Sequence, residues 1–369
     1  MPYLNFSLPS YPLMRDMWDE LALETRPIVI YGMGNGADKL LARMEKYNIT
    51  PSDIFASDGF VRGHSFRGMR VLSFSEIKEK YEDFVIILSF ASSRTEVLEM
   101  LCDIDKKYDM YVPDMPVAGE EEYFDREFYN DNYDKILSAY NSLADEISKN
   151  AYAAIVNYKL SGRMSYLESA YSEKDELYSC LPCDSIHSML DLGAYNGDTL
   201  REGIEYFPHL SEAVLVEPDP KNYKRLMKYL DSGVGIQTKA INACALDRVG
   251  EVFFASSGNR NSTATATASY KNKESEIPSI TADSLERPFD YIKYDVEGAE
   301  MAALLGTHGT IEKYRPTLLV SLYHRSRDLF EIVNYLTRYE EYDLFLRRLR
   351  CVPAWEIDLI LIPKDKRND

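Results

Sequence analysis

The chain has 369 residues, of which 45% are hydrophobic and 12% aromatic, and its formal net charge is -18. This length exceeds the usual size of a domain built around one hydrophobic core, so we expect at least two domains. The composition is that of a globular protein rather than a disordered one. The negative charge argues against a general affinity for nucleic acids, which requires a basic surface.

The N-terminus and the cysteines indicate the compartment. The first ten residues lack a basic segment followed by an apolar run, and no stretch reaches the about 18 apolar residues of a membrane span. Five cysteines without framework spacing fit reduced thiols. One CxxC, at Cys180 and Cys183, has no second pair nearby, so no metal site is expected. The sequence therefore predicts a cytoplasmic protein, with homo-oligomerisation left open.

Residues 27–118 have the pattern of a small Rossmann-like α/β domain, preceded by an N-terminal segment over residues 1–26. An apolar run over residues 28–31 is typical of a buried strand, and it leads through a glycine-rich turn into a helical pattern. A second apolar run, over residues 84–88, is also followed by a helical pattern. Because strands and helices alternate, we expect a parallel sheet.

Residues 119–185 change to a helical period and lack an evident strand. The spacing of one apolar helix face is seen at Ile136, Leu137, Tyr140, Leu143 and Ile147. We predict a helical connector that packs on one or both domains.

From residue 186 to 369 the α/β alternation returns. Apolar runs typical of buried strands lie at residues 189–192, 213–217, 291–295 and 317–321, with a final pair at 342–346 and 357–362. This order predicts a doubly wound sheet that ends in a hairpin-like pair. Residues 256–273 are rich in Ser, Thr, Ala and Asn, and we expect a mobile loop that helps to cover the site.

The ends of these strands are the places where a doubly wound sheet binds ligands. Asp191 ends the first strand and leads into Gly193 and Gly197, which allow the backbone to approach a ligand before a helix begins. Glu217 ends the second strand, about 20 residues later, at the offset from which an acidic side chain binds ribose hydroxyls. A full GxGxxG is absent, which favours an adenosine without a pyrophosphate.

Another strand end, later in the chain, carries several carboxylates. Asp295 ends the run over residues 291–295, and Glu297 and Glu300 lie just beyond it. Asp295 and Glu297 would lie at the mouth of the site. The alternative is that they only cap the following helix, where acidic side chains complement the helix dipole.

Six segments follow one another in order: DLGAYNGDT, VLVEPDPKNYKRL, INACALDRVGEVFF, SITADSL, YIKYDVEGAEMAALLG and RPTLLVSLYH. Over residues 186–363 this succession resembles the FkbM family of class I S-adenosylmethionine-dependent methyltransferases, most specifically in DVEGAE. The resemblance implies S-adenosyl-L-methionine as the cofactor and O-methylation, often of a carbohydrate or polyketide hydroxyl. Tyr195 and Asn196 depart from the residues that many members carry in the glycine turn.

The resemblance also implies roles for individual positions. The glycine turn would cradle the methionine part of the cofactor, and Glu217 would hold the ribose. Asn242, Ala243 and Cys244, at the end of the third strand along the chain, would lie beside adenine. The implied cofactor-binding residues are Asp191, Gly193, Ala194, Gly197, Glu217, Asn242, Ala243, Cys244 and Asp295.

Methyl transfer to a hydroxyl requires that the acceptor lie in line with the methyl carbon and that its proton be removed. Asp295 and His324 are the candidate bases, with Glu297 positioning the acceptor. A lone histidine is more often packed or capping, but His324 follows a strand end in the cleft. We expect O-methylation of a saccharide or glycan precursor, so the partner would be a small-molecule or glycan acceptor.

The N-terminal glycine turn and the segment over residues 68–73 resemble the Rossmann-like N-terminal domain of bacterial sugar O-acyltransferases. This resemblance implies a nucleotide or nucleotide-sugar site at Gly32, Gly34, Gly36 and Asp58. A scaffold or dimerisation role is the alternative. Two rival functions also stay open: a nicotinamide-dependent sugar-modifying enzyme, and a ligand-binding module without catalysis.

Overall fold

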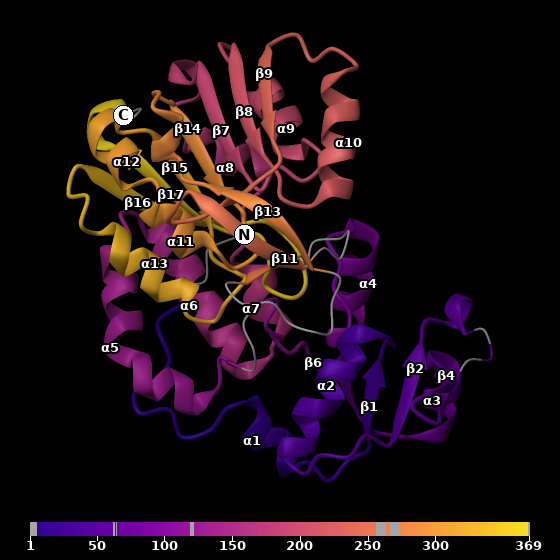
Figure 1. Ribbon diagram of the computed structural model, residues 1–369. Coiled ribbons are helices and arrows are strands. Elements are labelled where there is room, and N and C mark those ends of the chain that lie inside the picture. Colours follow the sequence, from indigo (N-terminus) through magenta and orange to yellow (C-terminus); the bar gives the residue numbers. More distant parts are fainter. Residues whose placement is uncertain are drawn as a thin grey trace.

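The computed structural model describes residues 6–61, 63, 65–118, 122–255, 263–265 and 274–367. Two large sheets lie at opposite ends of the molecule with helices between them (Figure 1). The N-terminal sheet, in indigo, lies at the lower right of this view, and the C-terminal sheet lies at the top.

The N-terminal sheet has six strands in the order β3-β4-β2-β1-β5-β6, and only the β3–β4 pair is antiparallel. Apolar runs produce β1 and β5, which are buried along their whole length and match the two predicted strands. The elements of this part are α1 (Met17–Ala22), β1 (Ile28–Tyr31), α2 (Asn35–Lys46), β2 (Asp53–Ala56), β3 (Ser65–Phe66), β4 (Met69–Ser73), α3 (Phe74–Lys80), β5 (Val85–Leu88), α4 (Thr95–Asp105) and β6 (Asp109–Tyr111).

Four helices follow, as the helical period predicts: α5 (Arg126–Ser142), α6 (Glu146–Ser161), α7 (Met164–Ser169) and α8 (Lys174–Ser179). Asp125 and Asp145 start the two long helices by accepting hydrogen bonds from backbone N–H groups of the first turn. Helix α6 is buried on most sides and packs against β16 (Tyr342–Arg348), while α5 packs against α13 (Asp328–Leu336). These helices therefore pack directly against the C-terminal part; how the chain divides into domains stays a prediction.

The C-terminal sheet is doubly wound, as predicted, with seven strands in the order β16-β17-β15-β14-β7-β8-β9. All neighbours are parallel except β17, which pairs antiparallel with both β15 and β16. The remaining elements are β7 (Ser188–Leu192), α9 (Asp198–Tyr206), β8 (Glu212–Val216), α10 (Pro220–Leu230), β9 (Gln237–Ile241), β14 (Tyr291–Tyr294), α11 (Glu300–Leu305), α12 (His308–Tyr314), β15 (Thr317–Ser321) and β17 (Ile357–Pro363).

A small third sheet lies between β9 and β14 in the chain. It contains β10 (Cys244–Ala245), β11 (Gly250–Ala255), β12 (Thr263–Thr265) and β13 (Glu274–Ile280), in the order β10-β13-β11-β12. Of the loop predicted over residues 256–273, only β12 belongs to the described residues. The expected lid otherwise lies outside them.

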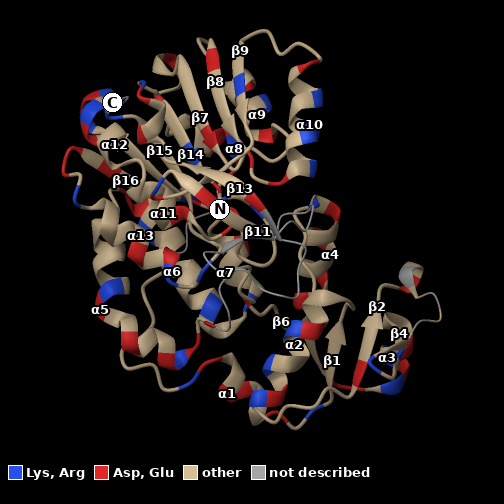
Figure 2. Ribbon diagram, viewed as in Figure 1, with Lys and Arg blue, Asp and Glu red and all other residues tan. Residues whose placement is uncertain are grey.

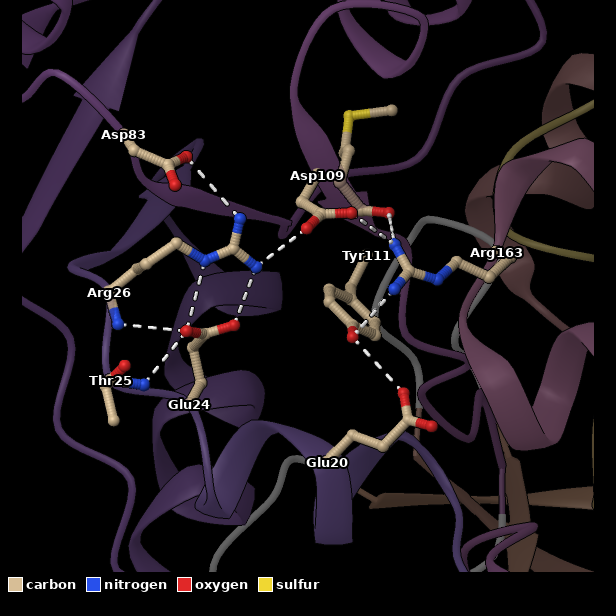
Figure 3. A network of polar contacts seen from close by, with 9 residues as sticks. Glu20, Glu24, Thr25, Arg26, Asp83, Asp109, Tyr111 and Arg163 are labelled. Carbon is tan, nitrogen blue, oxygen red and sulfur yellow. Dashed lines mark hydrogen bonds and ion pairs between the residues drawn. The ribbon is translucent and has the colours of Figure 1, made fainter.

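An ion-pair network joins the N-terminal segment, the edge of its sheet and the helical region (Figure 3). Arg26 donates to Glu24 at 2.7 Å and to Asp109 at 2.7 Å. Arg163, which directly precedes α7, donates to the other oxygen of Asp109 at 3.3 Å and to the hydroxyl of Tyr111 at 2.8 Å. Since most of these groups are partly exposed, the network fixes orientation more than it adds stability.

The surface carries interspersed charges of both signs, with lysine and arginine gathered along α10 (Figure 2). Among the described residues, no helix has the length and apolar character needed to cross a membrane.

Candidate functional site

A cleft of about 780 Å³ lies at the carboxyl ends of β7, β8 and β14. This is where the sequence places the site. Five of the predicted residues line the cleft: Gly193, Glu217, Cys244, Asp295 and Glu297. The other predicted cofactor residues do not line the cleft: Asp191, Ala194, Gly197, Asn242 and Ala243.

The glycine turn after β7 brings two strand ends unusually close. Gly193 has φ +93°, and a Cβ at this position would lie 1.8 Å from the carbonyl oxygen of Asp295. Gly197, at φ +84°, would place a Cβ 2.7 Å from the ring of Tyr229. Ala194 is fully buried in the core. Close packing and backbone conformation therefore require glycine at both positions, and of the two Gly193 lines the cleft.

Glu217 is buried at the end of β8, and its carboxylate organises the rim of the cleft. Its Oε2 accepts from the backbone N–H of Tyr195 and its Oε1 from that of Asp219, both at 2.8 Å. Burial raises the pKa of Glu217 to about 8, although these two hydrogen bonds favour the ionised form. Hydroxyl donors, such as those of a ribose, would restore the ionised carboxylate.

Residues after β9 support Glu217 from the other side. The side-chain amide of Asn242 donates to the backbone oxygens of Glu217 at 2.7 Å and Pro218 at 3.0 Å. Ala243 is fully buried, while Cys244 contributes to an apolar wall of the cleft. Asn242 therefore positions the rim, and the wall itself suits a flat apolar group such as adenine.

Lys293 is a charged residue inside β14 that sequence reasoning did not single out. Its Nζ donates to Asp295 Oδ2 at 3.0 Å and to the hydroxyl of Thr199 at 3.1 Å. Despite burial, the charges of Asp295, Asp191 and Asp198 hold the pKa of Lys293 well above its ordinary value. A lysine in a strand of otherwise buried residues was the only sequence signal for this ion pair.

Asp191 lies fully buried beneath the cleft, with no hydrogen bond to its carboxylate oxygens in the described part of the chain. Burial raises its pKa to about 7, against the opposing charge of Lys293. The residue therefore acts on the cleft through Lys293 and not by direct exposure to it.

Asp295 lies at the mouth of the cleft as predicted by the sequence. The hydroxyl of Tyr323 donates to its Oδ1 at 3.2 Å. Burial opposes ionisation, but the charges of Lys293 and His324 outweigh it and lower the pKa of Asp295 to about 2. Asp295 is thus an anion throughout the neutral range and a weak base.

His324 is fully buried among three carboxylates. Its Nδ1 lies 2.9 Å from Glu300 Oε1, and its Nε2 lies 3.4 Å from Glu297 Oε2 and 3.5 Å from Asp295 Oδ1. Burial alone would lower its pKa, but these carboxylates raise it well above the ordinary 6.5. His324 therefore carries a proton already, which argues against its expected role as a base.

Glu297 differs from Asp295 in both backbone and charge. It adopts φ +55°, an uncommon conformation for a residue with a side chain, in the turn that leads into α11. Burial raises its pKa, against the lowering effect of His324. Simple helix capping does not describe this geometry: the backbone N–H groups of Val296 and Gly298 donate to Glu300 instead, at 2.9 and 3.3 Å.

Asp295, Glu300 and His324 each offer one ligand atom, and these atoms lie within 4.8 Å of one another. A metal ion here would require the imidazole to lose its proton, because a ligating histidine is neutral. The proton on His324 already compensates the surrounding carboxylates, and the absence of a metal requirement stays a prediction.

The structure does not bring all of the predicted N-terminal residues together. A cavity of about 860 Å³ lies at the carboxyl ends of β1 and β5 and is lined by Gly36, Lys39 and, from the distant β16–β17 connection, Trp355. Gly32 and Gly36 pack against Ser89 and Phe90, and Gly34 begins α2 with open space around it. Asp58 does not line this cavity; it accepts from the backbone and hydroxyl of Ser75.

A peptide segment connects this cavity with the cleft. Residues 112–113 and 115–117 line the N-terminal cavity, and the backbone N–H of Ala118 donates to the carbonyl oxygen of His324 at 2.9 Å. A Cβ on Gly298 would lie 2.8 Å from that of Ala118. The N-terminal part therefore contacts the site directly.

Residues 191–347 match the family model of the methyltransferase FkbM domain. The fold resembles that of a methyltransferase FkbM from Methylobacillus flagellatus KT, with a TM-score of 0.68 and 19% identity, covering 96% of this chain and 94% of that chain. This similarity extends over the N-terminal part and establishes a common class I methyltransferase fold.

Two further structures are more distant. An rRNA methylase from Streptococcus thermophilus is 12% identical with a TM-score of 0.33, covering 51% of this chain and 92% of that chain. A methyltransferase from Podospora anserina bound to S-adenosylhomocysteine is 13% identical with a TM-score of 0.33, covering 74% of this chain and 98% of that chain. The comparison with curated proteins gave no match.

Proposed function

We propose that this protein, a methyltransferase with S-adenosylmethionine as its cofactor, methylates a hydroxyl group of a saccharide or glycan precursor. Residues 191–347 match the family model of the methyltransferase FkbM domain. The observation that carries the choice of a hydroxyl is Glu297, a carboxylate with a raised pKa at the mouth of the cofactor cleft. A carboxylate with a raised pKa is a stronger base than an ordinary one, which suits removal of the acceptor's proton.

The cleft offers groups that fit each part of the cofactor. Glu217 would accept hydrogen bonds from the ribose hydroxyls, and the wall formed by Pro218 and residues 244–246 would contact adenine. The cofactor carries positive charge on its sulfonium and its amino group, which Asp198 and Asp295 would stabilise. The chemistry of these residues therefore fits S-adenosylmethionine.

When bound, S-adenosylmethionine would supply the methyl group, and the sulfur of the cofactor would keep the electrons of the broken carbon–sulfur bond as a neutral thioether. Asp295, held ionised by Lys293, would orient the cationic end of the cofactor. Glu297 would take the proton of the acceptor hydroxyl as the new carbon–oxygen bond forms. The protonated His324 fixes both carboxylates without taking a proton itself.

The acceptor type is tested by incubation of the purified chain with methyl-labelled S-adenosylmethionine and a panel of saccharides. We expect label in O-methyl groups, identified by mass spectrometry and NMR of the product. Label confined to amines would contradict the proposal.

Replacement of Glu297 by glutamine is expected to lower kcat by about 100-fold, the usual contribution of a general base, with little change in cofactor affinity. For the wild type, kcat should rise with pH through the raised pKa of Glu297 and level off above it. Glu312→Gln, an exposed change on α12, serves as the control. Turnover of Glu297→Gln at the wild-type rate would exclude this base.

Replacement of Glu217 by glutamine is expected to weaken S-adenosylhomocysteine binding about 10- to 100-fold, because a charged acceptor is lost. In the wild type the carboxyl is protonated below its pKa of about 8. Ribose hydroxyls bind the ionised form, so affinity should increase as the pH rises from 6 to 8 and level off above 8.

Isothermal titration calorimetry at several pH values measures this effect. In Glu217→Gln the part of the pH dependence that comes from this carboxyl should vanish, whereas the exposed Glu205→Gln on α9 should behave as the wild type. Wild-type affinity in Glu217→Gln would remove the ribose assignment.

The N-terminal cavity supports a second candidate function, binding of a nucleotide sugar or a nicotinamide cofactor. Lys39 and the N-terminus of α2 would attract a phosphate there, although Asp58 lies away from the cavity. Calorimetry of the full chain with a nucleotide sugar and with NAD distinguishes these ligands from a scaffold role.

A further inference from the structure

The N-terminal cavity is built by both halves of the chain. Residues at the carboxyl ends of β1 and β5 and at the start of α2 form one part of its lining. Pro353 and Trp355, from the connection between β16 and β17, form another part. One of the two tryptophans in the sequence therefore lines this cavity, while the other, Trp18, lies in the N-terminal core. A ligand bound here would contact residues from both ends of the chain.

Of the residues that the structure describes, Lys39 is the single charged side chain in the lining. Its Nζ donates to the backbone oxygen of Pro116 at 3.1 Å, and no carboxylate in the described part of the chain forms an ion pair with it. An ammonium group has three N–H donors, so two of them are left for a ligand. An anion could therefore bind Lys39 without displacing a carboxylate.

The start of α2 adds backbone donors one turn away from Lys39. Its N-cap residue is Gly34, which has no side chain to accept hydrogen bonds from the first turn, and the space beside Gly34 is open. Gly36 lies so close to the end of β5 that a Cβ would be 2.0 Å from the backbone oxygen of Ser89. The N–H groups of an uncapped helix start attract a phosphate. Together with the lysine, they favour a phosphate over a neutral group.

The other walls favour a flat ring. Phe90 and Trp355 contribute aromatic surface, and Met33, Leu88 and Met115 contribute apolar surface. The indole N–H of Trp355 is buried and has no hydrogen-bond acceptor within the described ranges of the chain. A buried indole N–H usually finds an acceptor, which a carbonyl group or ring nitrogen of a ligand would supply. These walls therefore suit a heteroaromatic base better than an aliphatic chain, which offers no acceptor.

One segment of the cavity wall leads directly to the turn that carries the proposed base. Residues 115–117 line the cavity, and the next residue, Ala118, donates its backbone N–H to the carbonyl oxygen of His324 at 2.9 Å. A Cβ on Gly298, which follows Glu297, would lie 2.8 Å from that of Ala118. The position of this segment therefore affects the position of the turn.

A second segment of the wall leads to the end of β15. Trp355 lies two residues before Ile357, whose carbonyl oxygen accepts from the backbone N–H of Leu322 at 2.8 Å. The next residue, Tyr323, donates its hydroxyl to Asp295 in the cofactor cleft at 3.2 Å. A ligand that orders the Trp355 segment would thus also order residues of the cleft.

We propose that the N-terminal cavity binds a phosphorylated ligand with a heteroaromatic base, such as a nucleotide, and that its binding strengthens cofactor binding in the cleft. The phosphate lies at Lys39 and the base on Trp355. The inference deepens the second candidate function of this cavity and does not depend on the identity of the methyl acceptor. Because the ligand has already fixed both wall segments, less ordering is left for the cofactor, which gives positive coupling. By linkage, the cofactor strengthens nucleotide binding by the same factor.

The test uses calorimetry of the full chain with AMP, GMP, CMP and UMP, each compared with its nucleoside. The chain is first saturated with S-adenosylhomocysteine, so that the cofactor cleft is occupied. We expect at least one nucleotide to bind about 10-fold or more tightly than its nucleoside, as expected for a hydrogen bond to a charged group. Lys39→Gln should abolish this difference. Lys78→Gln, an exposed change on α3, is the matched control and should retain it.

Tryptophan fluorescence locates the bound nucleotide. In Trp18→Phe, where Trp355 is the remaining tryptophan, we expect the nucleotide to quench the emission. In Trp355→Phe, which keeps an aromatic ring but loses the indole N–H, the quenching should vanish. The emission of Trp18 in this second variant shows whether the chain is folded.

The coupling is measured by titration of S-adenosylhomocysteine with and without the nucleotide that binds. We expect its affinity to increase about 5-fold or more in the wild type and to stay unchanged in Lys39→Gln. Equal binding of nucleotides and nucleosides, a retained difference in Lys39→Gln, or retained quenching in Trp355→Phe would overturn the site. An unchanged affinity for S-adenosylhomocysteine in the wild type would overturn the coupling.

These outcomes are separate from those that test the methyl acceptor. Nucleotide binding as described, together with methyl label confined to amines, would support the inference and contradict the proposed acceptor. O-methylated saccharide without nucleotide binding would support the proposed acceptor and overturn the inference.

Discussion

Replacement of Gly193 by alanine is expected to abolish cofactor binding and to lower the free energy of unfolding by about 3 kcal/mol. The backbone at φ +93° is strained for any residue with a side chain, and the new methyl group would lie 1.8 Å from the carbonyl oxygen of Asp295. Because both contact partners are backbone, the ends of β7 and β14 must separate. Asp295 would then leave its position in the cleft.

Denaturant unfolding and titration with S-adenosylhomocysteine measure the two effects of this change. Gly233→Ala is a matched control, since Gly233 also has positive φ, +84°, but has open space where the Cβ would lie. We expect it to cost about 1 kcal/mol and to leave cofactor binding intact. Normal cofactor affinity in Gly193→Ala would contradict the close-packing argument.

Replacement of His324 by alanine is expected to destabilise the protein by about 3–5 kcal/mol and to stop turnover, because buried carboxylates lose their cation. The folded pKa of His324 lies above its ordinary 6.5, so its contribution is complete below about 6.5 and is lost only as the pH rises through the raised value. The contribution of Asp295 is present above its ordinary 3.8 and is lost as the pH falls through about 2. The cluster therefore stabilises the fold at neutral pH.

A double-mutant cycle identifies the partner of this histidine. Glu300→Gln removes a charge but keeps an acceptor for the backbone N–H groups of Val296 and Gly298. Combined with His324→Ala, it should be less destabilising than the sum of the single changes by about 1–3 kcal/mol. His187→Ala, at an exposed position, should have little effect. Additive single changes would exclude a coupled ion pair.

The strands that were predicted correctly share a physical property. β7, β15 and β17 are mainly apolar runs that are buried along their whole length, which is typical of strands in a sheet covered on both faces. β9 was harder to recognise, because as an edge strand it keeps every residue at least partly exposed and has a polar sequence. β6 has only three residues, and its strand state depends on pairing with β5.

The site was predictable where position along a strand decides location. Asp191, Glu217 and Asp295 end parallel strands, and the structure brings these ends to one edge of the sheet. The charge states were not predictable, because they depend on burial and on partners from other elements. Glu300 raises the pKa of His324, and Lys293 lowers the pKa of Asp295. The expected bases, His324 and Asp295, are therefore poor bases, and Glu297 takes that role in the proposal.

The packing of α6 limits how this chain can be divided. The backbone N–H of Leu346, in β16, donates to the hydroxyl of Ser148, and Arg347 pairs with Asp145 at the start of the helix. An expression fragment that starts at residue 186 would lack α6, so the backbone N–H of Leu346 would lose its acceptor and Arg347 would lose its counter-ion Asp145. Dissection of the chain for biochemical work should therefore cut before α5, so that the helices remain with the sheet they cover.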